Sequence, residues 1–234
     1  MAKRHGKGRL IVIDGSDGSG KATQAALLLS RLRKDGYRVR MLDFPRYESN
    51  LFGTLIGECL AGEHGDFAGL DPKITSVLYA ADRFESKATI ERWLRDGCVV
   101  ILDRYVSSNQ IHQGGKISEP RKRREFLEWL DRMEFGVFGL PRPDAIIHLH
   151  VPTEVSRRLL AGKEAVSKKP YLRGGSRKDT LETDERYLAK SRESALRLVR
   201  RRNDWHQVEC VRKGELLARE DIAEKVYEVV EGLL

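Results

Sequence analysis

IVIDGSDGSGKATQ, residues 11–24, carries the strongest structural signal in this chain. An apolar, β-branched run leads into a glycine-rich loop, and a helix-forming segment follows the loop. Gly15, Gly20 and Lys21 have the spacing of the pattern G-x-x-x-x-G-K-[ST], in which backbone N–H groups and the lysine hold phosphates. The strand–loop–helix context therefore predicts a site for a nucleoside triphosphate. The predicted ATP-binding loop comprises Gly15, Ser16, Asp17, Gly18, Ser19, Gly20, Lys21, Ala22 and Thr23.

The loop departs from its pattern at one position. Ala22 stands where a Ser or Thr hydroxyl normally contacts Mg²⁺, and Thr23 comes one position too late to replace it directly. Two interpretations follow from this departure. Either the loop has lost its chemistry, or the metal ion is held by other groups.

Composition narrows the class of protein. The 234 residues are 40% hydrophobic and 33% charged, which is typical of a soluble globular protein with a core of its own. No apolar run approaches the roughly 20 residues of a membrane span, and the short apolar stretch near the start is unlike a signal peptide. Cys59, Cys98 and Cys210 show no pairing pattern, so we expect a cytoplasmic protein without disulfides or a zinc site.

Positive charge is unevenly distributed along the chain. The formal net charge is +8, and residues 163–202 contain 13 Lys/Arg against six Asp/Glu. Such an excess favours a polyanionic partner, either nucleotide phosphates or nucleic acid. The run RKRR at 121–124 is interpreted as the solvated start of a helix rather than a nucleic-acid patch, because Glu125 and Glu128 follow it.

Short β-branched apolar runs alternate with helical patterns. Five strands are predicted at 9–14, 37–43, 97–103, 144–151 and 206–211. Helices are predicted at 21–34, 50–61, 72–96, 119–135, 153–160, 180–202 and 216–233. The alternation predicts an α/β fold with a parallel sheet, in which ligands bind beyond the carboxyl ends of the strands.

The basic segment 162–179, GKEAVSKKPYLRGGSRKD, fits neither a strand nor a regular helix. Its glycines, its proline and its positive charge are the composition of a mobile lid that closes over phosphates. An ordinary surface loop explains the same composition equally well.

Polar residues follow two of the predicted strands. Asp103 and Arg104 lie in the run ILDRY at 101–105, where the predicted strand ends. An acid in this place is typical of the carboxylates near the metal ion in phosphate-loop enzymes, although a helix N-cap is the alternative. Phe44 offers an apolar surface to a base, and Arg46 offers a guanidinium to a phosphate.

Two helical patterns carry further candidates. Tyr79 and Arg83 lie four residues apart on one helix face, where they could contact a base or belong to the core. If 107–115 is helical, Asn109, His112 and Gln113 share one polar face. A hydrogen-bonded surface histidine is the alternative for His112.

Together these segments resemble the thymidylate kinase family of phosphate-loop nucleoside monophosphate kinases. The matching pieces are GSDGSGKATQ, FPRY, LYAADRFE, DRYVSSNQIHQGG and the late basic segment, in the family's order and over most of residues 9–200. The resemblance implies one domain over 1–234 with a lid at about 162–182. It also implies the P-loop kinase fold, with a five-stranded parallel sheet flanked by helices and a mobile basic lid. The implied activity is transfer of the ATP γ-phosphoryl group to dTMP, giving dTDP for dTTP synthesis.

The resemblance also implies a role for each candidate residue. Lys21 and Arg104 would neutralise the transferred phosphate, with Arg104 bridging to the acceptor phosphate that Arg46 also meets. Asp17 would take the deoxyribose 3′-hydroxyl close to the metal ion.

The remaining implied contacts are with thymine and the sugar. Phe44 and Tyr79 would pack against thymine, Arg83 would donate to O4, and Ser108 with Asn109 would meet the base edge. His112, where many members have Tyr, would lie beside Gln113 on the face that excludes a 2′-hydroxyl, which leaves the strictness of deoxy selectivity open.

Gly18 after the loop Asp is the family pattern in which the lid supplies a catalytic arginine, here Arg173 or Arg177, beside Lys178. Mg²⁺ would be bound by ATP, water and the carboxylates of Asp17, Asp103 and Glu182, so that Ala22 need not be a defect. The implied partners are dTMP and ATP in a homodimer, with no membrane and no nucleic acid. The alternatives are a kinase for dUMP or dCMP and a catalytically silent nucleotide-binding protein.

Overall fold

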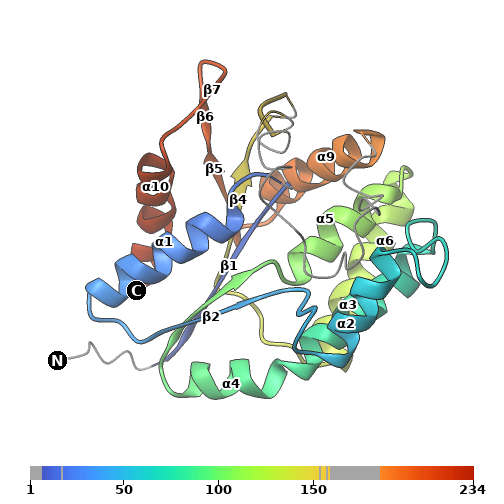
Figure 1. Ribbon diagram of the computed structural model, residues 1–234, viewed down its shortest axis with the longest axis horizontal. Helices are drawn as coiled ribbons and strands as arrows, with labels where there is room; N and C mark the ends of the chain where they lie inside the picture. Colours follow the sequence, from blue (N-terminus) through green and yellow to red (C-terminus); the bar gives the residue numbers. More distant parts are fainter. Residues whose placement is uncertain (1–6, 17, 153, 157, 159–184) are drawn as a thin grey trace.

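Five parallel strands form the centre of the computed structural model, which describes residues 7–16, 18–152, 154–156, 158 and 185–234 (Figure 1). The strands are β1 (Arg9–Gly15), β2 (Val39–Asp43), β3 (Val99–Asp103), β4 (Ala145–His150) and β5 (Trp205–Glu209). Their order is β2-β3-β1-β4-β5, and every neighbouring pair is parallel. The predicted α/β fold with a five-stranded parallel sheet is confirmed.

Side chains of β1 alternate between two cores because successive residues of a strand point to opposite faces. Ile11 and Ile13 belong to the core cluster on one face of the sheet. Leu10 and Val12 belong to the cluster on the other face. Both faces of the central strand are therefore buried, which explains its uninterrupted apolar sequence.

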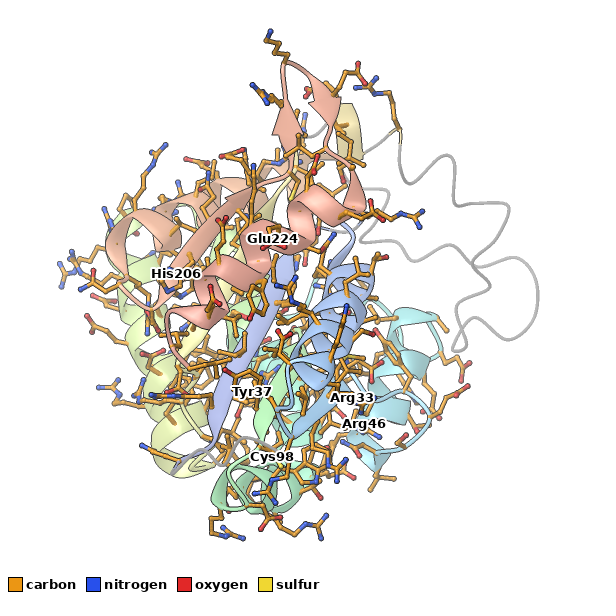
Figure 2. The ribbon with its side chains drawn as sticks, turned by 90° about the vertical axis from the view of Figure 1, so that its left-hand side faces the viewer. Arg33, Tyr37, Arg46, Cys98, His206 and Glu224 are labelled. Carbon is orange, nitrogen blue, oxygen red and sulfur yellow. The ribbon has the colours of Figure 1, made fainter. Side chains whose placement is uncertain are left out.

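Two helices cover the first face. These are α1 (Lys21–Lys34), which directly follows the glycine loop, and α10 (Arg219–Glu231) near the end of the chain. Figure 2 looks onto this face, with Arg33 on α1 and Glu224 on α10. Val226 and Val230 of α10 share their core cluster with Leu28 of α1.

The other face is covered by a larger group of helices (Figure 1). Nearest the sheet lie α4 (Lys87–Arg95), α5 (Val106–Lys116) and α9 (Glu185–Arg201), whose Ile90, Ile111 and Ala195 join one core cluster. Further out lie α2 (Leu51–Leu60), α3 (Pro72–Glu85) and α6 (Pro120–Asp131). Because α1 leaves β1 toward one face and α5 leaves β3 toward the other, a crevice forms between these strands at their carboxyl ends.

The predicted single helix over 72–96 is wrong, because the chain forms two helices that meet at Ser86. The Ser86 N–H donates to the Arg83 carbonyl, three residues back instead of four. The Ser86 hydroxyl also accepts a hydrogen bond from Asn50 at 3.2 Å. Such a tightened turn and a competing side-chain contact end a regular helix.

Other element ends differ from the predictions. The predicted helix at 119–135 is helical to Asp131 and continues as the π-helical turn η1 (Arg132–Val137). The predicted strand at 206–211 ends at Glu209, and a short antiparallel hairpin follows, formed by β6 (Val211–Arg212) and β7 (Glu215–Leu216). Of the predicted helix at 153–160, residues 154–156 and 158 are described and are helical. Within the described ranges, no helix has both the length and the apolar character to cross a membrane.

Candidate active site

A cavity of about 270 Å³ opens at the carboxyl ends of β1, β2 and β3. Its volume is close to the lower end of the roughly 300–1,000 Å³ that is usual for small-molecule sites. The glycine loop and the start of α1 form one side, and the segments that follow β2 and β3 form the rest. The lining residues are Gly18, Gly20, Lys21, Ala22, Thr23, Asp43, Phe44, Pro45, Tyr47, Asp103 and Arg104.

The glycine loop bends through backbone conformations that favour glycine. Gly18 and Gly20 have φ angles of 79° and 88°, and Gly20 directly precedes α1. The loop therefore delivers the N-terminus of α1 to the cavity, where N–H groups without a helical partner attract anions. The described part of the loop therefore has a backbone suited to an anion, and its role in binding phosphate stays a prediction.

Lys21 is the buried cation of this loop. Its ammonium group donates to the carbonyl oxygens of Gly15 at 3.1 Å and Ser16 at 2.9 Å. The hydroxyl oxygens of Ser16 and Ser19 are buried without a hydrogen-bond partner among the described residues. Unpaired buried hydroxyls are costly unless a ligand or water satisfies them, so this loop is suited to receive phosphate oxygens.

Asp103 and Asp43 bring two carboxylates to the cavity. They are register partners at the ends of β3 and β2. Burial raises the pKa of Asp103 above its ordinary value, and the nearby charges of Lys21 and Arg104 reduce that effect. Within the described residues, Oδ1 of Asp103 is buried and accepts no hydrogen bond, which suits an oxygen that faces a hard cation such as Mg²⁺. The described ranges contain no group of three or more His, Cys, Asp or Glu side chains that could hold a metal ion.

Asp14 at the end of β1 ties the glycine loop to α5. Its carboxylate accepts hydrogen bonds from the hydroxyls of Ser107 at 2.6 Å and Ser108 at 2.8 Å, and from the Gly15 N–H at 2.8 Å. Burial alone would raise the pKa of Asp14, but Arg104, Ser107 and Lys21 together hold it below its ordinary value. Ser108, which the resemblance assigns to the base edge, thus donates to Asp14 in this structure.

Arg104 lines the cavity with an unusual backbone. Its φ of 67° lies in the left-handed region that side chains other than glycine rarely adopt. The Arg104 N–H donates to the Ile13 carbonyl at 3.0 Å, which ties β3 to β1 at this point. Strained backbone of this kind is common where a side chain is aimed for function.

His112 on α5 connects Arg104 to α9. Its Nε2 lies 3.4 Å from Nη1 of Arg104 and its Nδ1 lies 3.3 Å from the Ser191 hydroxyl. Because a guanidinium can only donate, Nε2 accepts and Nδ1–H donates to Ser191. The ring also stacks on Tyr187 with 5.8 Å between centroids. Gln113, its predicted neighbour, is buried.

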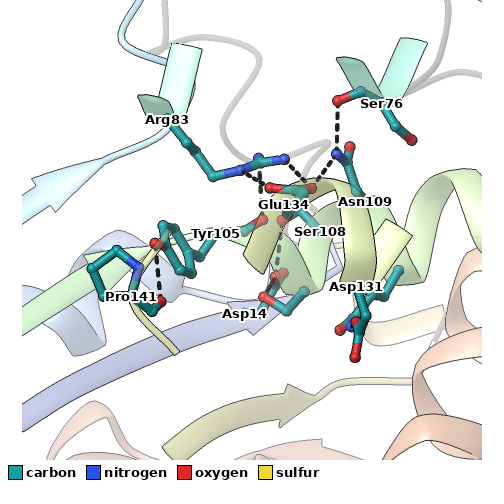
Figure 3. A network of polar contacts seen from close by, with 11 residues as sticks. Asp14, Ser76, Arg83, Tyr105, Ser108, Asn109, Asp131, Glu134 and Pro141 are labelled. Atoms are coloured by element: carbon teal, nitrogen blue, oxygen red, sulfur yellow. Dashed lines mark hydrogen bonds and ion pairs between the residues drawn. The ribbon is translucent and has the colours of Figure 1, made fainter. Parts of the chain in front are cut away.

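Arg83 and Asn109 meet at a buried carboxylate that the sequence did not reveal (Figure 3). Arg83 donates from Nε at 2.8 Å and from Nη2 at 2.6 Å to the two oxygens of Glu134. Asn109 donates from Nδ2 to the same carboxylate at 2.8 Å. Burial raises the pKa of Glu134, and the charge and hydrogen bonds of Arg83 oppose the rise. Neither Arg83 nor Asn109 lines the cavity.

The apolar candidates are placed differently from one another. Phe44 is buried and lines the cavity, with its ring 6.1 Å from that of Tyr105. Tyr79 packs against Phe67 instead, at a centroid distance of 6.1 Å, and does not line the cavity. The backbone N–H of Arg46 donates to the Asp82 carboxylate at 3.2 Å. The structure thus brings Phe44 to the cavity with Lys21, Asp103 and Arg104, and keeps Tyr79 apart.

Four predicted residues lie outside the described part of the chain: Asp17, Arg173, Arg177 and Glu182. Three acids that are not among the predicted site residues line the cavity or contact residues of the site: Asp14, Asp43 and Glu134. Asp14 and Asp43 each end an apolar strand, which is the same signal that identified Asp103. Glu134 lies in a helical stretch with no local motif, so the sequence carried no comparable signal.

Comparison with known proteins agrees on one family. The family model described as Thymidylate kinase matches residues 13–222. The thymidylate kinase of Mycobacterium tuberculosis is 37% identical over 154 residues, which cover 66% of this chain and 71% of that protein. The probable thymidylate kinase of Pyrococcus abyssi is 37% identical over 154 residues, covering 65% of this chain and 69% of that protein.

A solved structure extends the likeness to the fold. The structure of thymidylate kinase from Candida albicans superposes with a TM-score of 0.72 and covers 97% of this chain and 92% of its own. At 24% sequence identity, this match shows the fold alone. The structure of the Candida albicans enzyme is described as revealing the origin of a broad substrate specificity.

Proposed function

The chain belongs to the thymidylate kinase family, and we propose that it transfers the γ-phosphoryl group of ATP to dTMP, giving ADP and dTDP. The observation that carries the proposal is the convergence on one cavity of Lys21, Asp103 and Arg104 from the carboxyl ends of two adjacent strands. Phe44, from the neighbouring strand end, gives the same cavity an apolar wall for a base.

The chemistry needs positioning and charge neutralisation more than proton transfer. The acceptor is a phosphate oxygen that is already anionic at neutral pH, so no general base is required. Lys21 and the N-terminus of α1 hold the ATP phosphates, and Arg104 bridges the acceptor and the transferred phosphoryl group. Arg173 or Arg177, within the proposed lid at about 162–182 of a single 1–234 domain, supplies a further cation.

The donor set fits Mg²⁺ bound together with ATP. Asp103 presents a buried oxygen with no hydrogen bond from the described residues, and we assign Asp17 and Glu182 to the same ion, partly through water. Bound there, Mg²⁺ supplies positive charge to the β- and γ-phosphate oxygens. This set does not require a hydroxyl at Ala22.

The exposed surface of α3 supports the proposed homodimer. Ile74, Val77 and Phe84 are exposed, and their spacing of three and seven residues puts them on one face of the helix. Val137 of η1 is another exposed apolar residue. Exposed apolar groups on one helix face commonly mark a protein–protein interface.

The three free, buried cysteines, Cys59, Cys98 and Cys210, support a reducing, cytoplasmic location.

A coupled assay of ADP release tests the function, with ATP, Mg²⁺ and either dTMP, dUMP or dCMP as acceptor. We expect ADP release that requires an acceptor, with the highest kcat/KM for dTMP. The matched control is Lys21→Ala, which removes the phosphate-binding ammonium and should lower the rate by a hundredfold or more, as is usual on loss of such a cation. Absence of acceptor-dependent ADP release would favour a silent nucleotide-binding protein, and preference for dUMP or dCMP would reassign the substrate.

A further inference from the structure

Glu134 is a buried carboxylate that contacts both Arg83 and Asn109, the two polar residues proposed to meet the base. It lies on η1 and is fully buried, and it pairs with Arg83, whose exposed fraction is 2%. The two oxygens of its carboxylate accept the Nε and Nη2 groups of Arg83 in a two-pronged contact. A third donor of Arg83, Nη1, is directed to the Tyr105 carbonyl at 3.3 Å (Figure 3).

Glu134 also determines which way the Asn109 amide faces. Nδ2 of Asn109 lies 2.8 Å from the Glu134 carboxylate and 3.1 Å from the Ser76 carbonyl. Both neighbours are acceptors, so the nitrogen must point to them and the oxygen must point away. Both N–H donors of this amide are therefore used internally, and Oδ1 is the polar atom that it can offer to a ligand.

Glu134 thus leaves Arg83 as a hydrogen-bond donor and Asn109 as a hydrogen-bond acceptor toward a ligand. Arg83 has five N–H donors, of which Glu134 and Tyr105 engage three, so the guanidinium keeps donors for a ligand. Asn109 keeps an acceptor. A pyrimidine with a C4 carbonyl and an N3–H presents the complementary pattern, whereas cytosine presents an amino group and an unprotonated N3 and is mismatched at both positions.

These groups lie close to the cavity. Tyr105, whose carbonyl accepts from Arg83, directly follows Arg104 in the cavity wall. The Tyr105 ring also packs against Phe44, which lines the cavity as the proposed base wall. Tyr105 thus connects Arg83, through its backbone carbonyl, to the cavity wall beside Phe44 against which the base is proposed to lie.

We propose that Glu134 is the positioning residue for base selectivity, because it fixes Arg83 as donor and Asn109 as acceptor against cytosine. This inference rests on the proposed function, since it takes a pyrimidine monophosphate as the acceptor. Glu134 contacts neither phosphate nor base in this account and acts through its two partners.

Glu134→Gln tests the inference. The amide nitrogen of Gln cannot accept from Arg83 or Asn109, so at least one of these contacts is lost and the Asn109 amide is free to turn over. We expect the ratio of kcat/KM for dTMP over dCMP to fall about tenfold or more, which is within the usual value of one well-placed polar contact. The change should come mainly from the KM for dTMP, with the KM for ATP unchanged.

An internal control separates selectivity from general damage. Uracil carries the same O4 and N3–H as thymine, so the ratio of dTMP over dUMP should stay within twofold of the wild-type value in Glu134→Gln. Asp144→Asn is the matched protein control, because it breaks another ion pair, Arg9–Asp144 at 2.8 Å. This pair lies where the parallel strands β1 and β4 begin, away from the cavity at their carboxyl ends. We expect this control to leave both ratios unchanged.

Glu134→Asp covers the case in which Glu134→Gln does not fold, because it keeps the charge and shortens its reach. We expect this variant to have a lower ratio of kcat/KM for dTMP over dCMP than the wild type, and to keep part of the wild-type preference for dTMP. Unchanged dTMP over dCMP ratios in every variant that folds would overturn the inference. Failure of both variants to fold would also overturn it, since Glu134 would then be a structural residue.

Absence of dTMP-dependent turnover in the wild type would instead refute the proposed function. In that case, calorimetry would measure the dissociation constants of dTMP and dCMP for the wild type and for Glu134→Gln. The ratio of the two constants would then test the role of Glu134.

Discussion

At the scale of single residues, the candidate site contains strain. Arg104 holds a φ of 67° while its N–H is fixed to Ile13 across the strand ends. For a residue with a Cβ atom, this conformation costs on the order of 1–2 kcal/mol. The left-handed turn brings the guanidinium to the cavity wall directly after Asp103. The strain is explained if Arg104 is needed there for phosphoryl transfer.

Comparing Arg104→Gly with Arg104→Ala tests this strain. Both changes remove the guanidinium, but glycine adopts a positive φ without a steric penalty. We expect the glycine variant to be more stable than the alanine variant by about 1 kcal/mol, after allowing for the greater freedom of glycine in the unfolded chain. Urea unfolding of the two proteins measures the difference. An alanine variant as stable as the glycine variant would show that the backbone here is not strained.

His148 provides a prediction for pH. Burial lowers its pKa from 6.5 to about 4, with smaller effects from Asp14 and His150. The unfolded chain therefore binds a proton that the folded chain refuses, so this histidine makes the free energy of unfolding decrease as pH falls below about 6.5.

His148→Gln should remove that contribution. Between pH 7 and pH 5, we expect the wild type to lose up to about 2 kcal/mol more stability than the variant. Urea titrations of both proteins at the two pH values measure the difference. His206, which lies on the edge strand β5, provides a control in His206→Gln. Parallel pH dependence of wild type and His148→Gln would contradict the prediction.

The residues of the site were predictable to different degrees. Lys21 and Asp103 follow from motifs and strand ends, because their roles depend on local sequence. Glu134 could not be found in this way, since it meets Arg83 only after α3 and η1 pack together from positions 51 residues apart. The partners of Arg83 and Asn109 were therefore missed even though both residues were identified.

At the scale of elements, the contact between β1 and α5 organises the site. The carboxylate of Asp14, at the end of β1, accepts hydrogen bonds from both serine hydroxyls in the first turn of α5. It also accepts a hydrogen bond from the N–H of Gly15 in the glycine loop. One side chain thus holds the phosphate loop against the helix that carries Asn109 and His112.

Asp14→Asn should weaken this connection. The amide keeps the shape of the side chain but loses acceptor capacity and charge, and hydrogen bonds to a charged group contribute roughly 1.5–3 kcal/mol. We expect a loss of about 2 kcal/mol at pH 7 in urea unfolding. Because the pKa of Asp14 is lowered in the fold, the difference should shrink as the pH falls below the unfolded value near 3.8 and the wild type is protonated. A loss that stays constant down to pH 2 would argue against the charge as its source.

The elements show where periodicity is informative. The five strands were predicted because buried parallel strands are uninterrupted apolar runs. The break at Ser86 was not, because both halves of 72–96 have helical patterns and the interruption depends on a contact with Asn50, 36 residues away. The hairpin of β6 and β7 is too short for a period of two to be recognised.

At the scale of the whole molecule, the apolar face of α3 is the feature that a monomer does not explain. Ile74, Val77 and Phe84 expose 57%, 40% and 48% of their surface. We expect a homodimer in solution that buries this face.

Ile74→Glu should shift the equilibrium toward the monomer, because burying an unpaired carboxylate in an interface is unfavourable. Sedimentation velocity at several protein concentrations measures the change. Leu216→Glu is the matched control, since Leu216 is a similarly exposed apolar residue on β7, far from α3 in Figure 1. If the wild type is monomeric, or if both variants remain dimeric, the α3 face is not the interface.

Arg104 is the residue through which this cavity is proposed to transfer phosphate from ATP to dTMP. The most direct test uses ATP labelled at the γ-phosphate and follows the label into nucleotide products with the wild type and with Arg104→Ala. We predict labelled dTDP from the wild type, and at least about a hundredfold less from Arg104→Ala with ATP binding retained. Labelled inorganic phosphate without dTDP would contradict phosphoryl transfer to dTMP, and undiminished dTDP formation by Arg104→Ala would contradict the role of Arg104.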